Sequence, residues 1–275
     1  MPPSYKADRV FHLRSQDATL KGQAPYIETD LYYNIDQNLT PQPDEALVVS
    51  INSAEIPVSF FPVSTNNKTI KFFESTDATA GNLVASTDVV LTEGNYTGAE
   101  LAVELARAIN ASNGLNNYTV AFSGATTKLT ITQPTDISFR FDFTVASSGS
   151  AWRLLGFNRA LKTGTDNGGN HTLVSDNAIN IGGDSAVFIR CPLSNINTYE
   201  SRHGGTSDIL AKIPISVQYN EIQHYEPIAN MFKSQLPRGQ PLNDLTIRLT
   251  DSDNNLINMN GLDWEFSLVV ETINV

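Results

Sequence analysis

The sequence predicts a mainly β protein built as a β-sandwich, and three observations support this prediction. Short segments that alternate apolar and polar residues occur from one end of the chain to the other, as in half-buried strands. Only 17% of the residues are charged, against roughly 25% in an ordinary soluble domain, and the abundant Asn, Thr and Ser suit turns and sheet surfaces. The strands do not alternate regularly with helices, which argues against a βαβ fold.

Seven segments carry the strand pattern. In chain order they are residues 47–51, 56–63, 69–74, 187–190, 209–219, 245–249 and 264–270. The second contains Pro57 and Pro62, which cannot donate a ladder hydrogen bond, so we expect an edge strand or a bend there. No fixed-period repeat is present, which argues against solenoids and propellers.

One helix is predicted, beginning after Thr97. Thr97 and Glu100 have the spacing of a capping box, in which each side chain accepts from a free amide at the helix start. Leu101, Leu105 and Ile109 then recur every four residues and form one apolar stripe. The Asn- and Gly-containing segment that follows ends the helix.

The helix belongs to a predicted α+β unit over residues 86–165, inserted into the β chain. Strand-like runs follow the helix, and a helical turn stopped by Gly156 is expected at 152–157. The flanking segment 76–82 is poor in large apolar residues, and 163–170 has the Gly and Asn content of an exposed loop. Residues 25–85 and 166–275 are then the sandwich, and residues 1–24, which lack periodicity, an extended N-terminal arm.

The net charge limits the partners. The chain has a length of 275 residues, enough for one large β domain or two modest ones, and a formal charge of −11. This charge repels phosphate and disfavours a nucleic-acid-binding role, with no specific sequence expected to be bound. The N-terminal arm, residues 1–24, instead has a net charge of +2, which leaves a net charge of −13 for the rest of the chain. It could dock on an acidic neighbour or be a frayed terminus.

Cysteine usage and hydropathy indicate a protein made in the cytosol. The single cysteine, Cys191, excludes an internal disulfide framework. No apolar run reaches the ~18 residues of a membrane span, and the first residues lack an apolar signal core. The Asn-x-Ser/Thr sequons are therefore expected to be by-products of composition.

No catalytic motif is found. The sequence has no phosphate-binding Gly-rich loop, no dinucleotide fingerprint and no nucleophile elbow. Cys191 precedes a proline in a strand-like stretch and is expected to be buried and inert. His12, His171, His203 and His224 are too far apart for a local metal motif. We therefore predict no catalytic, cofactor or metal site, although the histidines could still converge in space.

Residues 251–255 imitate the start of a calcium loop. An EF-hand would need glycine at the sixth position and glutamate at the twelfth, where this chain has Leu256 and Leu262. We expect a turn made by Asx side chains instead.

Adjacent aromatic pairs indicate contact surfaces. In a strand one ring of each pair faces outward, and outward aromatics on a weakly charged surface are typical of subunit interfaces, although they could also stack on bases or sugars. Basic residues of the arm and a His-containing loop complete the set. The predicted interface residues are Lys6, Arg9, Arg14, Tyr32, Tyr33, Phe60, Phe61, Arg202 and His203.

Several segments, taken in order, carry a resemblance. They are Ser53-Ala-Glu-Ile-Pro57, Leu91-Thr-Glu-Gly-Asn-Tyr-Thr97, Trp152-Arg-Leu-Leu-Gly-Phe157, Leu245-Thr-Ile-Arg-Leu249 and Asn260-Gly-Leu-Asp-Trp-Glu-Phe-Ser-Leu268. This set resembles the penton and related minor capsid proteins of icosahedral double-stranded DNA viruses of the virophage, polinton-like and giant-virus group. The resemblance implies a single jelly roll, with five copies closing each capsid vertex and the 86–165 unit crowning it. It implies no catalytic residues. Not every member of this family has such an insertion. The chain could therefore be either the vertex protein or another minor capsid component.

We therefore expect a non-enzymatic structural protein of the virion that acts by assembly. Its expected partners are copies of itself in a homopentamer, the major capsid protein and other capsid components. The alternative is a receptor- or carbohydrate-binding β-sandwich such as a spike head. A hydrolase on a sandwich scaffold is a third reading, since acidic residues are plentiful, but no residue pattern locates its site.

Overall fold

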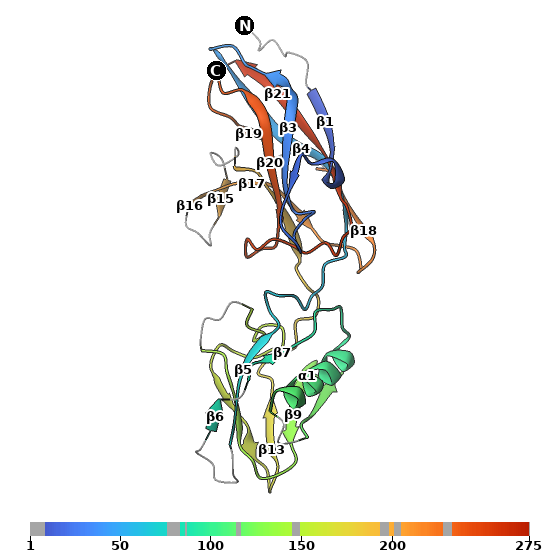
Figure 1. Cartoon of the computed structure of the whole chain (residues 1–275), viewed down its shortest axis with the longest axis vertical. Helices are drawn as coiled ribbons and strands as arrows, with labels where there is room; N and C mark the ends of the chain where they lie inside the picture. The colour runs from blue at the N-terminus through green and yellow to red at the C-terminus, as the bar shows by residue number, and fades with distance from the viewer. Residues whose placement is uncertain are drawn as a thin grey trace. The chain divides into compact units, whose positions relative to one another are not determined.

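The computed structural model describes residues 9–75, 83–85, 87–113, 117–144, 149–192, 198–200, 205–227 and 233–274 (Figure 1). The chain divides into two compact units. Unit 1 comprises Met1–Phe60 and Asp184–Val275, and unit 2 comprises Phe61–Gly183. Unit 2 is thus inserted into unit 1, and each has its own apolar core.

The regular elements of unit 1 are almost all strands. They are β1 (Arg9–Arg14), β2 (Leu20–Lys21), β3 (Asp30–Leu39), β4 (Glu45–Pro57), β14 (Ala186–Arg190), β15 (Thr198–Glu200), β16 (Gly205–Ser207), β17 (Ile209–Pro214), β18 (Ile222–Tyr225), β19 (Ser234–Gln235), β20 (Leu242–Thr250) and β21 (Glu265–Asn274), with a 3-10 turn at Ser15–Asp17. One sheet has the order β1-β21-β4-β18, with β19 also pairing with β4, and the other has the order β17-β14-β20-β3-β2. The small β15–β16 hairpin stands apart from both.

The strand pairing of unit 1 is that of a jelly roll. Without the two-residue strands β2 and β19, the two sheets contain eight strands, which in chain order are β1, β3, β4, β14, β17, β18, β20 and β21. The first pairs with the last, the second with the seventh, the third with the sixth and the fourth with the fifth, all antiparallel. This is a long hairpin wrapped into two facing sheets, which defines the jelly roll. The predicted mainly β, jelly-roll class is confirmed. In the sequence, unit 2 is inserted between the third of these strands, β4, and the fourth, β14.

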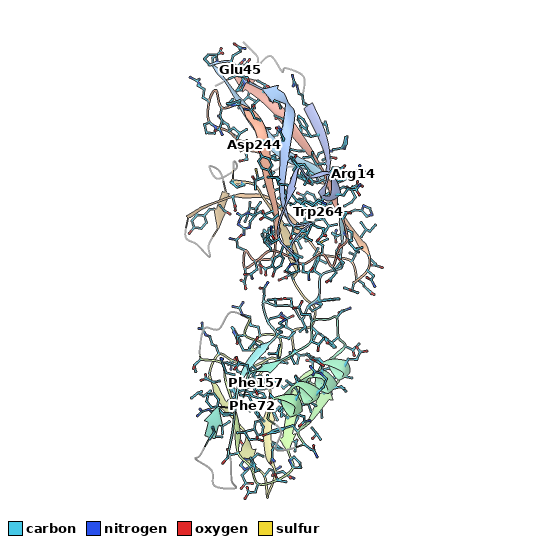
Figure 2. The ribbon with its side chains drawn as sticks, in the orientation of Figure 1. Arg14, Glu45, Phe72, Phe157, Asp244 and Trp264 are labelled. Atoms are coloured by element: carbon cyan, nitrogen blue, oxygen red, sulfur yellow. The ribbon has the colours of Figure 1, made fainter. Side chains whose placement is uncertain are left out.

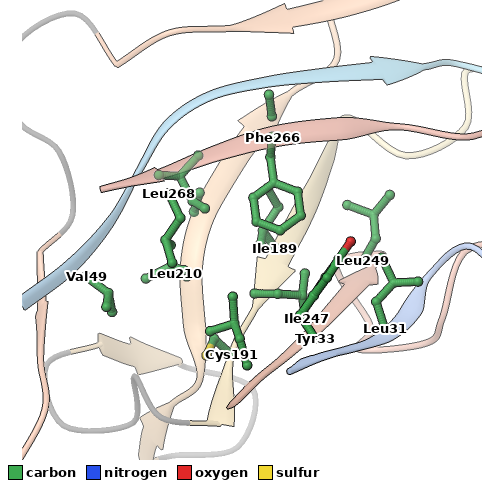
Figure 3. Packing of buried hydrophobic residues seen from close by; sticks show 14 of the residues in the cluster. Leu31, Tyr33, Val49, Ile189, Cys191, Leu210, Ile247, Leu249, Phe266 and Leu268 are labelled. Atoms are coloured by element: carbon green, nitrogen blue, oxygen red, sulfur yellow. The ribbon is translucent and has the colours of Figure 1, made fainter. Parts of the chain in front are cut away.

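The core of unit 1 fills the space between its two sheets. Phe266 comes from β21, whereas Leu31 and Ile247 come from the facing sheet, and all three point into it (Figure 3). The indole of Trp264 stacks on Phe266 with ring centroids 5.0 Å apart, and its Nε1 donates to the Glu28 carbonyl at 2.7 Å. Burial therefore costs this tryptophan no hydrogen bond.

In its described residues, unit 2 is an α+β unit with two antiparallel sheets and one helix. Its elements are β5 (Thr69–Ser75), β6 (Leu83–Ala85), β7 (Val89–Val90), α1 (Gly98–Asn113), β8 (Thr119–Ser123), β9 (Lys128–Gln133), β10 (Phe139–Asp142), β11 (Leu161–Thr163), β12 (Thr165–Asp166) and β13 (His171–Val174). The sheets have the orders β11-β10-β5-β6, with β7 also on β5, and β12-β13-β9-β8. The helix packs against β8.

An aromatic cluster forms the centre of unit 2. Its neighbouring rings have centroids 5.2–6.5 Å apart, mostly edge-on or tilted, a geometry that adds to the stabilisation from apolar burial. The cluster includes Phe72 and Phe157 (Figure 2) together with Tyr118, Phe139, Phe141 and Phe143.

Two local predictions in unit 2 are confirmed by hydrogen bonds. The Thr97 amide donates to Glu100 Oε2 at 2.8 Å, and the Glu100 amide donates to Thr97 Oγ1 at 3.3 Å, so the capping box forms. The turn at 152–157 stops at Gly156, whose φ is +73°. A Cβ there would lie 2.4 Å from the Asn177 carbonyl oxygen, so both the backbone conformation and the available space require glycine.

The boundaries of the insertion differ from the expected 86–165. β5, which was assigned to the sandwich, pairs with β10 inside unit 2, and β13, also assigned to the sandwich, pairs with β9. The unit therefore covers Phe61–Gly183. These pairings join segments far apart in the chain, so no local signal marks them. The expected low-apolar flank at 76–82 lies outside the described residues.

The N-terminal arm expected over 1–24 is mostly part of the sandwich. β1 pairs with β21 along its whole length, and β2 pairs with β3. β1 turns only Phe11 and Leu13 toward the core, which is too short an alternation to be recognised in sequence. Residues 1–8 lie outside the described part of the chain.

Candidate assembly surface

A row of charged residues crosses the outer face of the sheet β1-β21-β4-β18. Arg14 of β1 lies opposite Glu265 of β21, Glu265 lies opposite Glu55 of β4, and Glu55 lies opposite His224 of β18. Strand alternation points these side chains away from the core, which the intervening residues such as Phe266 fill. Four strands distant in sequence thus build one polar row.

A second row runs beside the first and is held by hydrogen bonds. His12 Nδ1 lies 2.9 Å from Ser267 Oγ, and Ser53 Oγ donates to the same Ser267 Oγ at 3.2 Å. Ser267 therefore connects the edge strand β1 to β4. This contact fixes the position of the His12 ring on the sheet surface.

The two rows surround a hollow of about 430 Å³, which we call the polar hollow. It is lined by His12, Leu13, Arg14, Ser53, Glu55, Glu265, Phe266 and Ser267. Arg14, labelled in Figure 2, lies at its edge and pairs with Asp17 at 2.7 Å. Both partners of this pair are more than half exposed, so the guanidinium can exchange partners at little cost.

The acidic pair gives the polar hollow its electrostatic character. Partial burial, followed by the nearby Glu265 carboxylate, raises the pKa of Glu55, and the histidines on either side only partly oppose this. Two adjacent carboxylates that repel each other favour the arrival of a cationic group. The hollow is therefore suited to receive a lysine or arginine from another protein.

Exposed apolar side chains lie along the edge that β1 and β2 form, which we call the first edge. Val10 on β1 is 51% exposed and Leu20 on β2 is 64% exposed. β1 and β2 are the last strands of their sheets, and an edge strand with outward apolar groups is a template for pairing with another chain. The opposite edge, formed by β17 and β18, carries Ile222, which is 50% exposed.

Apart from Tyr33, the predicted interface residues fall into three groups. Arg9 and Arg14 are exposed on the first edge, and Tyr32, Phe60 and Phe61 are half-buried. Lys6, Arg202 and His203 lie outside the described residues.

Tyr33 is a correction to the predicted interface. It is 4% exposed and packs edge-on against Phe266 in the core. Its hydroxyl donates to the Arg14 carbonyl at 3.0 Å. The alternation across Tyr32–Tyr33 was read correctly, but only the register decides which of the two rings faces outward.

The residues of the polar hollow were not predicted, apart from Arg14. Ser53, Glu55 and Glu265 do alternate with apolar neighbours, a signal that could have marked them as outward-facing. Nothing in the sequence brings the three strands into register.

Other readings of single residues are resolved by contacts. Cys191 is buried, as predicted. Asp251 Oδ1 accepts from the amides of Asp253 and Asn255, both at 2.8 Å, which is the predicted Asx turn. Among the described residues, no helix combines the length and apolarity that a bilayer crossing requires.

The solved structures similar to this chain include two viral structures. The crystal structure of the selenomethionine-labelled mavirus penton protein has a TM-score of 0.47 and 11% identity, over 97% of this chain and 100% of that chain. The cryo-electron microscopy structure of the Sputnik virophage has a TM-score of 0.46 and 10% identity, over 97% of this chain and 98% of that chain. No family model and no curated protein matches this chain. One similar structure is a penton protein and the other belongs to a virophage, both of which are named in the resemblance drawn from the sequence.

Proposed function

We propose that this chain is a structural subunit of an icosahedral viral capsid that acts by assembly rather than catalysis. In this proposal five copies form a closed ring at a capsid vertex, the number implied by the sequence resemblance. The ring contacts the major capsid protein and is part of the virion.

The apolar first edge supports this proposal most directly. A soluble monomer gains nothing from keeping Val10 and Leu20 half exposed or more on neighbouring edge strands. Burying each against another subunit contributes about 1–2 kcal/mol. A cyclic ring needs two different, complementary edges on each copy, and a sandwich offers two.

The charges of the two edges complement one another. The first edge carries the exposed basic residues Arg9, Arg14 and Lys21 with one exposed acid, Asp17. This leaves it positive in a chain of net charge −11.

The opposite edge has the other sign. Glu221 and Glu226 are exposed at the two ends of β18, against the single exposed Lys212 on β17. Head-to-tail packing would therefore place positive against negative, which fixes orientation and speeds encounter.

The fold class also fits a shell protein, because jelly rolls occur in viral capsid and lectin domains. A lectin reading needs outward aromatic rings around a polar site. The polar hollow is lined by carboxylates and histidine, and its one aromatic ring, Phe266, belongs to the core. These features favour protein contacts over sugar binding.

Sedimentation velocity of the purified chain over a range of concentrations tests the proposal. We expect a monomer–pentamer equilibrium, with fivefold rings in negative-stain electron microscopy. The variants Val10→Asp and Leu20→Asp should remain monomeric. Val103→Asp is the matched control, because Val103 is 71% exposed on α1 of unit 2 and belongs to neither edge of unit 1. A chain that stays monomeric at all concentrations, or assembles equally well with both edge substitutions, would refute the proposal.

A further inference from the structure

We propose that unit 2 binds a divalent transition metal ion, for which Zn²⁺ is the probe, through His171, Asp136 and Asp166. This site is separate from the proposed assembly surface. One ligand atom from each of the three residues lies within 4.8 Å of the other two. An imidazole nitrogen with two carboxylate oxygens is a donor set suited to zinc and its neighbours.

The backbone brings the three residues together from two turns. Asp166 of β12 lies directly opposite His171 of β13 in the hairpin register. His171 in turn lies opposite Gln133, the last residue of β9, and Asp136 follows in the turn after that strand. A bound ion would therefore tie the β9–β10 connection to the β12–β13 hairpin.

Both nitrogens of the buried His171 ring face an oxygen atom. The side chain is only 7% exposed. Its Nδ1 lies 3.5 Å from the Gly164 carbonyl oxygen, and its Nε2 lies 3.3 Å from Asp136 Oδ1. Both neighbours are acceptors only, whereas a neutral imidazole has one N–H. A neutral ring would therefore leave one nitrogen facing an oxygen with no hydrogen between them, and a cation bound at that nitrogen removes this conflict.

A metal ion resolves this conflict with the geometry already present. Nδ1–H directed at a backbone carbonyl is the usual second contact of a metal-binding histidine, and it leaves the Nε2 lone pair for the ion. Two ligands about 2.0–2.1 Å from a tetrahedral zinc are about 3.3–3.4 Å apart. The Nε2–Asp136 distance of 3.3 Å has this value.

The third ligand needs only a side-chain movement. Asp166 is exposed, and its Oδ1 accepts a long hydrogen bond of 3.2 Å from the Gly169 amide. Rotation about its side-chain bonds can bring an oxygen to the ion. The two carboxylates carry a total charge of −2. A divalent ion balances this charge completely, whereas a proton on the imidazole ring would balance only half of it.

Titration of the metal-free full-length chain with ZnCl₂, followed by calorimetry and thermal unfolding, tests the proposal. We expect one ion per chain and a rise of the unfolding temperature of unit 2 by about 3 °C or more at saturating zinc. His224→Asn is the matched control, because His224 is an exposed histidine of unit 1, and it should leave binding unchanged.

Two exposed variants keep the test independent of folding defects at the buried histidine. Asp166→Asn should weaken binding at least tenfold. Asp136→Asn should do the same. The proposal is overturned if zinc does not bind or if binding survives both substitutions.

Discussion

The buried ion pair of unit 1 offers the sharpest test of the energetics. Arg190, the last residue of β14, is 1% exposed. Its NH1 donates to Asp208 Oδ1 at 2.9 Å and its Nε donates to Thr250 Oγ1 at 2.9 Å. Arg248 pairs with the other Asp208 oxygen. A single carboxylate thus pairs with two guanidinium groups, one of them fully buried.

Replacing Asp208 with asparagine keeps the shape of the side chain and removes its charge. Breaking a buried ion pair from one side costs about 3–5 kcal/mol. Arg190 keeps its bond to Thr250, and the new amide oxygen can still accept from it, so we expect about 3 kcal/mol. Urea unfolding at pH 7 measures this loss. Asp17→Asn, which breaks the exposed pair with Arg14, is the matched control and should cost less than about 1 kcal/mol.

The pH dependence of the same variant gives an independent check. Burial by itself would raise the pKa of Asp208, but Arg190 and Arg248 together outweigh it and hold the pKa below its ordinary value. The stabilisation is therefore complete above the ordinary aspartate pKa and is lost as the pH falls through the lower, folded-state pKa. The difference in the free energy of unfolding between wild type and Asp208→Asn should shrink as the pH falls through that window. A loss at pH 7 no larger than that of Asp17→Asn would show that the pair is not effectively buried, and would refute the reasoning.

Three further outcomes follow from single contacts. Burial raises the pKa of Asp184 to about 6, so the folded state disfavours its ionised form. The free energy of unfolding should therefore fall as the pH rises from about 4 to 6, and it should stay low above pH 6. Asp184→Asn should remove this pH dependence and add about 1–3 kcal/mol at pH 7, measured by urea titration. The Tyr118 hydroxyl donates to the buried Glu74 carboxylate at 2.8 Å, so Tyr118→Phe should cost about 1–3 kcal/mol by thermal unfolding, and an unchanged melting temperature would argue against the bond. Gly156→Ala should destabilise unit 2 by more than about 1 kcal/mol, measured by hydrogen exchange of its amides, because both its φ and its contact with Asn177 exclude a side chain.

The features that the sequence predicted correctly depend on contacts between near neighbours. The capping box joins Thr97 to Glu100 within one turn, and the Asx turn joins Asp251 to residues two and four positions away. The alternation of 264–270 likewise reflects the two faces of one strand. Such features are visible because a few adjacent residues supply all the groups involved.

The candidate site could not be predicted in this way. Arg14, Glu265, Glu55 and His224 come from four strands and meet only because the jelly roll pairs the first strand with the last and the third with the sixth. The true limits of unit 2 likewise depend on β5 pairing with β10.

The sequence by itself determined the mainly β class, the helix and its start, the buried cysteine and a weakly charged, acidic surface. The tertiary structure decided which strands pair, which ring of Tyr32–Tyr33 faces outward, and which polar side chains share a surface. The physical reason is that a strand alternates its side chains by itself, whereas the partner that it pairs with is chosen by packing across the whole core.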